Sequence, residues 1–195
     1  AATIVFPSGR AQGHRNIFLR SIEAMSKTLE RNIYGLRYPG FSIDKLDIPS
    51  PDPLTSVRYS CVFWIDHLCE APNKYSQSQG DLRDSGPVHR FLEGYLLYWI
   101  EASSLSGAMF DIVYTIGSLE RLLKKESNKS HLFDLTRDAR RFILSHGWAI
   151  RNAPLQVYAS ALIFSPRRSI TRKIFEGQGL NWITTKPAMA EDWNP

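Results

Sequence analysis

The 195-residue sequence lacks the patterns that mark the common catalytic and metal sites. A P-loop needs a glycine-rich turn that ends in Gly-Lys-Ser/Thr, and none of the 12 glycines precedes a lysine. The five histidines form no i,i+3 or i,i+4 pair with one another or with a cysteine, although zinc sites use such close pairs. We therefore expect no catalytic residue, no bound metal and no cofactor in this chain.

Cysteine is also scarce. Cys61 and Cys69 are the only two, and both fall in one predicted helix, where they are separated by roughly 12 Å along the axis. This distance excludes a disulfide within an intact helix, so we read both as reduced thiols and Cys61 as a small apolar side chain. No apolar run reaches the ~20 residues that a membrane span needs, and no leader sequence is recognisable. We expect a cytoplasmic chain without membrane contact.

The sequence has no concentrated block of charge of one sign. Its 24 basic and 19 acidic residues give a formal charge of +5, and the basic ones form only short clusters at 121–125, 137–141 and 167–173. A solvated helix face explains such clusters as well as nucleic-acid binding does, so we expect no nucleic-acid partner. The last two clusters form a possible docking surface for a protein partner. It consists of Arg137, Arg140, Arg141, Arg167, Arg168, Arg172 and Lys173.

Apolar residues, by contrast, are plentiful and recur at helical spacing. Hydrophobic residues make up 43% of the chain and aromatic residues 12%, which is enough for one sizeable core. Steps of three and four residues between apolar positions predict an all-α fold, an array or bundle of about seven helices with extended proline-rich connections. The expected helices span about 13–36, 53–70, 87–102, 109–125, 131–153, 155–164 and 166–176.

The expected domain organisation is a helical domain over residues 13–183. Residues 1–12 contain a short β-prone run and are predicted to be a terminal segment or an edge strand. Residues 155–164 are apolar nearly all round, which favours burial among other helices. The tryptophans and tyrosines could line a ligand pocket, but at helical spacing they are more often core. The predicted core residues are Trp64, Trp99, Phe142, Trp148, Leu155, Tyr158, Leu162 and Phe164.

Four segments of the chain resemble a known family. They are SKTLERNIYGLRYPG at 26–40, YSCVFWIDHL at 59–68, VHRFLEGYLLYWIEASSL at 88–105 and, above all, WAIRNAPLQVYASALIFSPRRSITRKIFEGQGLNWI at 148–183. These segments look like the helical region of large fungal NACHT-type NTPases of the STAND class. In that family the region follows the nucleotide-binding module and precedes carboxy-terminal repeats, often WD-type propellers. The stretch TKPAMAEDWNP at 185–195 is similar to the junction before the repeats, so residues 184–195 are expected to be a linker.

The resemblance implies a non-catalytic connecting and regulatory domain that couples an upstream ATPase switch to downstream sensor repeats. The signalling would be of the vegetative-incompatibility or innate-immunity type. Its partners would be the other domains of the same protein, and any NTPase activity would lie outside this chain. One alternative is a free-standing helical protein-interaction domain. Another is an enzyme of unrecognised type.

Overall fold

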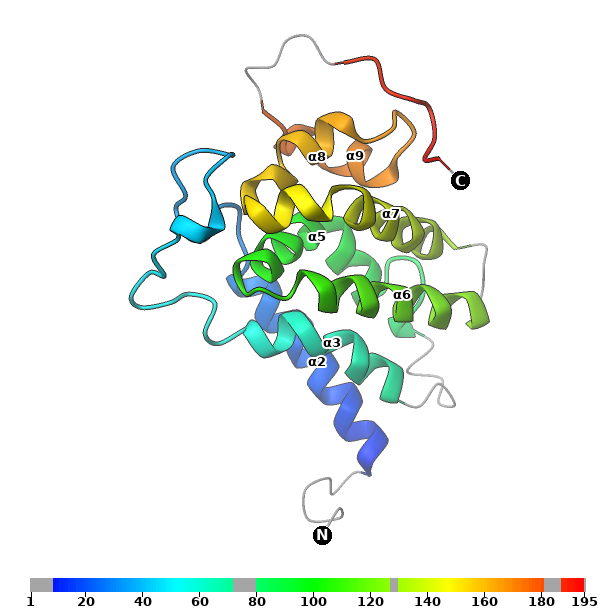
Figure 1. The fold of residues 1–195 in the computed structure, drawn as a ribbon. Coiled ribbons are helices and arrows are strands. Elements are labelled where there is room, and N and C mark those ends of the chain that lie inside the picture. The colour runs from blue at the N-terminus through cyan, green and yellow to red at the C-terminus, as the bar shows by residue number, and fades with distance from the viewer. Residues whose placement is uncertain (1–8, 72–79, 127–129, 181–186, 195) are drawn as a thin grey trace.

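The computed structural model describes residues 9–71, 80–126, 130–180 and 187–194. Within these ranges the chain is all-α, with seven α-helices and no strand (Figure 1), so the predicted fold class is confirmed. The α-helices are α2 (Arg10–Thr28), α3 (Arg58–Glu70), α5 (Pro87–Leu105), α6 (Met109–Glu126), α7 (His131–Asn152), α8 (Ser160–Phe164) and α9 (Ile170–Phe175). Three short 3-10 turns are η1 (Ile43–Lys45), η2 (Pro154–Val157) and η3 (Glu176–Gln178). The β-prone run at 3–6 lies outside the described residues.

The helices are stacked from one end of the molecule to the other in approximate chain order. Helices α2 and α3 pack together at one end, α5 and α6 occupy the middle, α7 runs antiparallel alongside α6, and α8 and α9 cap the opposite end (Figure 1). The proline-rich stretch 41–52 contains no helix apart from η1, as predicted. Turns at 31–34 and 53–57 flank it, so the helix predicted from residue 53 begins only at Arg58.

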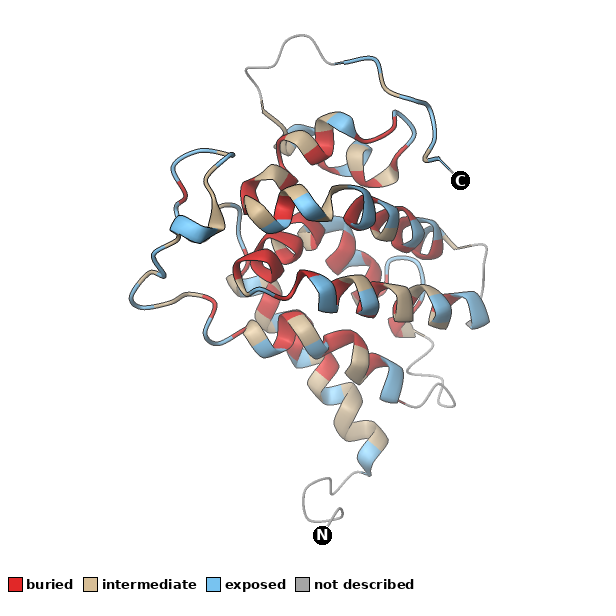
Figure 2. Ribbon diagram, viewed as in Figure 1, coloured by how far each residue is buried: buried red, intermediate tan, exposed pale blue. Residues whose placement is uncertain are grey.

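Helix α5 is the centre of this arrangement, because it contacts α2, α3, α6, α7 and η2. Its inner side is buried almost throughout its length (Figure 2). The Trp99 ring is fully buried, its indole N–H donates to the carbonyl of Cys61 at 2.7 Å, and it meets the Trp64 ring edge to face. This pair of indoles joins α3 to α5 with a large buried apolar area. The Trp99 N–H is satisfied, whereas the buried Nε1 of Trp64 has no hydrogen-bond partner among the described residues.

Six of the eight residues predicted to form the core are buried. They are Trp64, Trp99, Phe142, Leu155, Tyr158 and Leu162. The assignment of Trp148 and Phe164 to the core is wrong, because their side chains are 76% and 52% exposed. Trp148 follows Phe142 by six residues, which places it about 120° away around the helix axis, on the outer side of α7. Phe164 is the last residue of the one-turn helix α8.

The first helix ends earlier than its apolar periodicity predicts. The pattern extends to residue 36, but α2 ends at Thr28. Beyond it the chain turns through Asn32, which has the left-handed φ of 57°. The backbone N–H groups of Asn32 and Ile33 donate to the carboxylate of Glu101, at 3.0 and 3.1 Å. A buried acid in α5 therefore holds two amides that a longer α2 would use itself.

The single helix predicted over 155–164 is wrong as well, since the chain forms η2 and α8 with a turn between them. Ala159 has φ −102° and ψ −101°, which is not helical. The turn directs the Tyr158 hydroxyl into the interior, where it donates to Glu101. The helix predicted from residue 166 also begins later, since α9 starts at Ile170 and the Ser169 side chain caps it by accepting from the N–H of Arg172.

Candidate interaction surfaces

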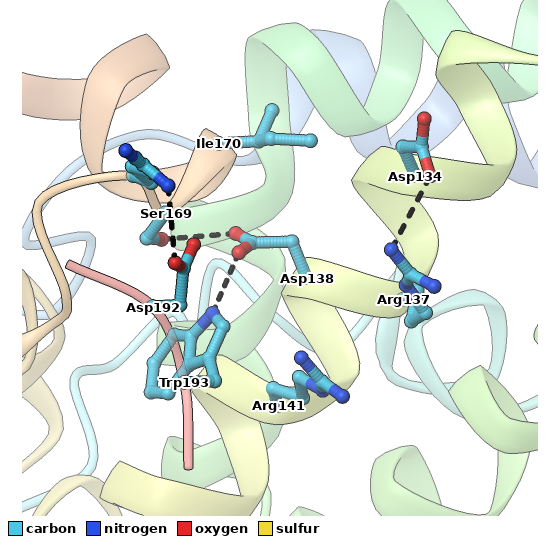
Figure 3. Close-up of a pocket in the computed structure, with 9 residues that line it drawn as sticks. Asp134, Arg137, Asp138, Arg141, Ser169, Ile170, Asp192 and Trp193 are labelled. Carbon is cyan, nitrogen blue, oxygen red and sulfur yellow. Dashed lines mark hydrogen bonds and ion pairs between the residues drawn. The ribbon is translucent and has the colours of Figure 1, made fainter. Parts of the chain in front are cut away.

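The basic residues predicted to form a docking surface come from α7, from the α8–α9 connection and from α9. Arg137, Arg141 and Arg168 surround a pocket of about 220 Å³ whose other walls include Asp138, Ser169 and Trp193 (Figure 3). Folding thus brings the two clusters, which are about 30 residues apart in the sequence, to one side of the molecule. We call the seven basic residues the arginine surface.

Ion pairs neutralise much of this surface. Arg137 lies 3.6 Å from the carboxylate of Asp134 on the same helix, and Arg140 lies 3.4 Å from Glu120 of α6. Arg140 is also partly enclosed, because its Nε atom has no contact with solvent and lies close to Gly117. Arg140 therefore serves the packing of α7 on α6. Within the described ranges, Arg141, Arg172 and Lys173 form no ion pair. Arg172 is half-buried and donates to the carbonyl of Ser165, so Arg141 and Lys173 are the exposed charges without a counter-ion.

Arg167 and Arg168 are exposed but bonded to residues 190–192. Their backbone N–H groups donate to the carbonyls of Ala190 and Glu191, at 3.0 and 2.9 Å. Their guanidinium groups lie 3.6 Å from Glu191, and Arg168 also lies 3.2 Å from Asp192. The described part of the segment predicted to be a linker, residues 187–194, is thus attached to the helical body. We call residues 187–194 the C-terminal strap.

Asp138 anchors this strap, and the sequence analysis did not single it out. Its Oδ2 atom accepts from the Ser169 hydroxyl at 2.9 Å and from the backbone N–H of Thr171 at 2.7 Å. Its Oδ1 atom accepts from the indole N–H of Trp193 at 2.7 Å (Figure 3). One buried carboxylate therefore joins α7, the start of α9 and the strap. An acidic residue between Leu135 and Phe142, on the apolar side of α7, was the available sequence signal.

A second buried acid, Glu101 of α5, also joins segments that are distant in the sequence. It accepts the two backbone N–H groups at residues 32 and 33 and the hydroxyl of Tyr158. Burial raises the pKa of Glu101, and the same burial raises the pKa of Tyr158. All three partners are donors, which makes them a cage for the ionised carboxylate.

A different surface lies between α6 and α7, where apolar side chains surround a groove of about 290 Å³. Its lining residues are Met109, Phe110, Val113, Ile143, Leu144, Gly147, Trp148 and Arg151. Phe110 is 73% exposed, so two large aromatic side chains, Phe110 and Trp148, stand at the surface here. Trp148 was predicted to lie in the core, so this groove was not among the predicted sites.

Two further titratable groups, a buried thiol and a pair of histidines, lie outside these surfaces. Burial raises the pKa of the Cys61 thiol to about 12, so it stays protonated at neutral pH. The Nδ1 atoms of His14 and His67 lie 2.9 Å apart, and Tyr59 bonds the other nitrogen of His67 at 2.7 Å. In the part of the chain that the structure describes, no cluster of three or more His, Cys, Asp or Glu side chains is placed to hold a metal ion. None of the described helices is long and apolar enough to cross a bilayer.

Comparison with known proteins gives one informative relative. No family model matches the chain, and no solved structure matches it. The chain is 43% identical over 195 residues to the vegetative incompatibility protein HET-E-1 of Podospora anserina. The match covers the whole of this chain but only 14% of that protein. This chain is similar to one segment of a fungal vegetative incompatibility protein.

Proposed function

We propose that this chain is a non-catalytic connecting and regulatory domain of a fungal NACHT-type signal-transducing NTPase. It would couple an ATPase switch on its amino-terminal side to sensor repeats on its carboxy-terminal side. The observation that carries this proposal is the 43% identity with HET-E-1, which extends through all 195 residues and yet spans 14% of that protein. Such a match is what one part of a much larger signalling protein would give.

The fold suits such a part, because transmission between two neighbours needs a body that moves as a unit and has two contact surfaces. The central helix α5 contacts five other elements, and the carboxylates of Glu101 and Asp138 hold segments that are distant in the sequence. The strap is attached to the body through Trp193 and Arg168, so movement of whatever follows would be passed to α7.

The arginine surface is the proposed contact with the neighbouring ATPase module. Arg141 and Lys173 are its exposed residues without an ion pair among the described residues, so they are the ones available to an acidic partner. Interfaces between domains of one chain are typically ~600–1,500 Å² and fairly polar, so reversing two exposed charges is expected to loosen the contact without unfolding the domain.

The first test is the gene that surrounds this sequence, which should encode a P-loop upstream and repeats downstream. The second uses that full-length protein with Arg141→Glu and Lys173→Glu together, and Lys124→Glu on α6 as the matched control. We expect the double variant to change the resting rate of nucleotide hydrolysis and the control to leave it unchanged. Absence of a P-loop upstream would contradict the proposal and favour the alternative, a free-standing interaction domain, to which the exposed α6–α7 groove also points.

A further inference from the structure

The groove between α6 and α7 is unusual because large apolar side chains form its walls and remain exposed. Phe110 on one wall is 73% exposed, and Leu144 and Trp148 on the other are 53% and 76% exposed. Ordinary surfaces carry single exposed hydrophobic residues, whereas a contiguous group around a hollow marks a binding surface. Met109, Val113 and Ile143 lie between them and form the rest of the lining.

The exposed side of α7 has a pattern that fits one kind of occupant. Arg141, Leu144, Trp148 and Arg151 follow each other at steps of three, four and three residues, and all four are exposed. Steps of this size keep them on one stripe of the helix, with the two arginines roughly 15 Å apart at its ends. The stripe therefore presents two apolar anchors bracketed by two positive charges.

These charges have no counter-ion in the described part of the molecule. No acidic residue lines the groove, and Arg151 lies over the Phe110 ring at 5.0 Å instead of pairing with a carboxylate. The adjoining hollow, which shares Leu144, contributes Arg140 and Arg141 and a single acid, Asp192. The groove lining itself is apolar except for Arg151. Arg141 lies beyond its other end, in hollows that it shares with Asp138 and Asp192 but without an ion pair to either.

We propose that this groove binds an amphipathic helix of a partner protein, with apolar side chains on one face and an acidic residue near each end. Apolar anchors of such a helix would fill the space between Phe110 and Trp148, and its acidic residues would meet Arg141 and Arg151 in charge-assisted hydrogen bonds. A second copy of this chain fits less well, because self-docking along the groove would bring arginines of both copies together with no acid between them. The helix-binding site shares Arg141 with the arginine surface, so the partner helix and the ATPase module proposed above would compete for this residue. Phe110, Trp148 and Arg151 belong to the groove alone.

Gly147 offers a way to close the groove without disturbing the fold. It lies in the groove lining within α7, and a Cβ added to it would meet only the terminal methyl group of Met109, at 3.8 Å, an ordinary contact. Glycine inside a helix is unfavourable relative to other residues, so a larger side chain here is expected to preserve or raise stability. Gly147→Leu would therefore block the occupant and keep the helix.

The test uses the full chain and a synthetic amphipathic peptide of about 18 residues, long enough to populate a helix in water. The peptide carries leucines and a tryptophan on one face and glutamates at both ends, and a second peptide replaces every glutamate with lysine. Fluorescence anisotropy measures binding to the parent chain and to Gly147→Leu, Trp148→Ala and Arg141→Glu/Arg151→Glu. Ile48→Ala is the control, because Ile48 is an exposed apolar residue that lines neither hollow.

We expect the acidic peptide to bind the parent chain and the Ile48→Ala control equally. Each groove variant should weaken binding by about tenfold or more, since buried aromatic anchors and their charged neighbours dominate such interfaces. The double charge variant should reverse the preference toward the lysine peptide. Failure of the acidic peptide to bind, or equal binding of both peptides, would overturn the proposal. Self-association of the chain that Gly147→Leu abolishes would overturn it too, in favour of a second copy as the occupant.

Discussion

The Tyr158 hydroxyl donates a hydrogen bond of 2.6 Å to Oε2 of Glu101 in the interior of the protein. The same carboxylate holds the backbone N–H groups of Asn32 and Ile33, so three segments of the chain meet at one side chain. Arg31 adds a positive charge nearby, with its guanidinium 4.7 Å from the centre of the Tyr158 ring. A carboxylate that accepts several hydrogen bonds in a dry site stabilises the fold only while all of its partners are present.

We expect Glu101→Leu to destabilise the domain by about 3–5 kcal/mol, because it leaves two backbone donors and a hydroxyl buried without an acceptor. Tyr158→Phe removes one donor and its bond, and should cost about 1–2 kcal/mol. Urea unfolding followed by circular dichroism measures both variants. A Glu101→Leu chain as stable as the parent would show that apolar packing replaces the cage.

The strap should loosen when its anchor is removed, while the helical body stays folded. Trp193→Ala deletes the donor to Asp138, and the backbone amides of Arg167 and Arg168 should then exchange faster with solvent, because their acceptors at Ala190 and Glu191 leave. The amide of Thr171 is the internal control, since it bonds to Asp138 directly and should remain protected. Hydrogen exchange measured by NMR separates these sites, and unchanged exchange at Arg167 and Arg168 would contradict a strap held by Trp193.

Acid should destabilise the domain through His146. Burial lowers the pKa of this histidine from its ordinary value of 6.5 to about 4, so the folded protein holds it neutral. Below pH 6.5 the unfolded chain binds the proton first, and stability is lost as the pH falls from about 6.5 toward 4. The loss is on the order of 1–3 kcal/mol, given 1.36 kcal/mol per unit of pKa difference.

The variant His146→Gln isolates this contribution. Glutamine keeps a polar group within reach of the Ser165 hydroxyl, which bonds to His146 at 3.1 Å, but it does not titrate. The difference in unfolding free energy between parent and variant should therefore change between pH 7 and pH 4 and be constant above pH 7. Urea unfolding curves measured from pH 4 to pH 8 check this difference. A difference that is independent of pH would show that His146 does not contribute to the acid sensitivity.

The chain should neither bind nor hydrolyse ATP or GTP, because it has no glycine-rich turn followed by Lys and Ser/Thr to hold the phosphates. Calorimetric titration with each nucleotide and Mg²⁺ is the measurement, with a P-loop protein titrated under the same conditions as the positive control. Saturable micromolar binding would contradict the expectation and reopen the possibility of an enzyme of unrecognised type.

The arginine surface was only partly predictable from the sequence. The basic clusters were visible as runs of residues, but their pairing was not, because Glu120, Glu191 and Asp192 lie on other elements. The exposure of Trp148 was within reach, since helical periodicity alone places it on the same side as Arg141 and Leu144. Aromatic character alone suggests a core residue, but the position of Trp148 on the helix is the signal that agrees with the structure.

The sequence by itself determined the helical class, the helices that became α5, α6 and α7, and most of the buried residues. These follow from interactions between residues close along the chain: apolar steps of three and four, Pro87 in the first turn of α5, and the Ser130 side chain that accepts from the N–H of Phe133 at 3.1 Å. Each of these signals can be read within one or two helical turns.

Only the tertiary structure decided where α2 ends, why the chain breaks after Tyr158, and that the strap lies on α7. Glu101 and Tyr158 are separated by 57 positions and Asp138 and Trp193 by 55, so no local pattern links them. A buried carboxylate without hydrogen-bond donors is costly, so its partners depend on which groups the packed helices place beside it. When those groups are backbone N–H groups, they bond to the carboxylate and the helix ends there. Local periodicity and capping therefore set most of the helices, and the need to satisfy the buried Glu101 carboxylate set the end of α2 and the break after Tyr158.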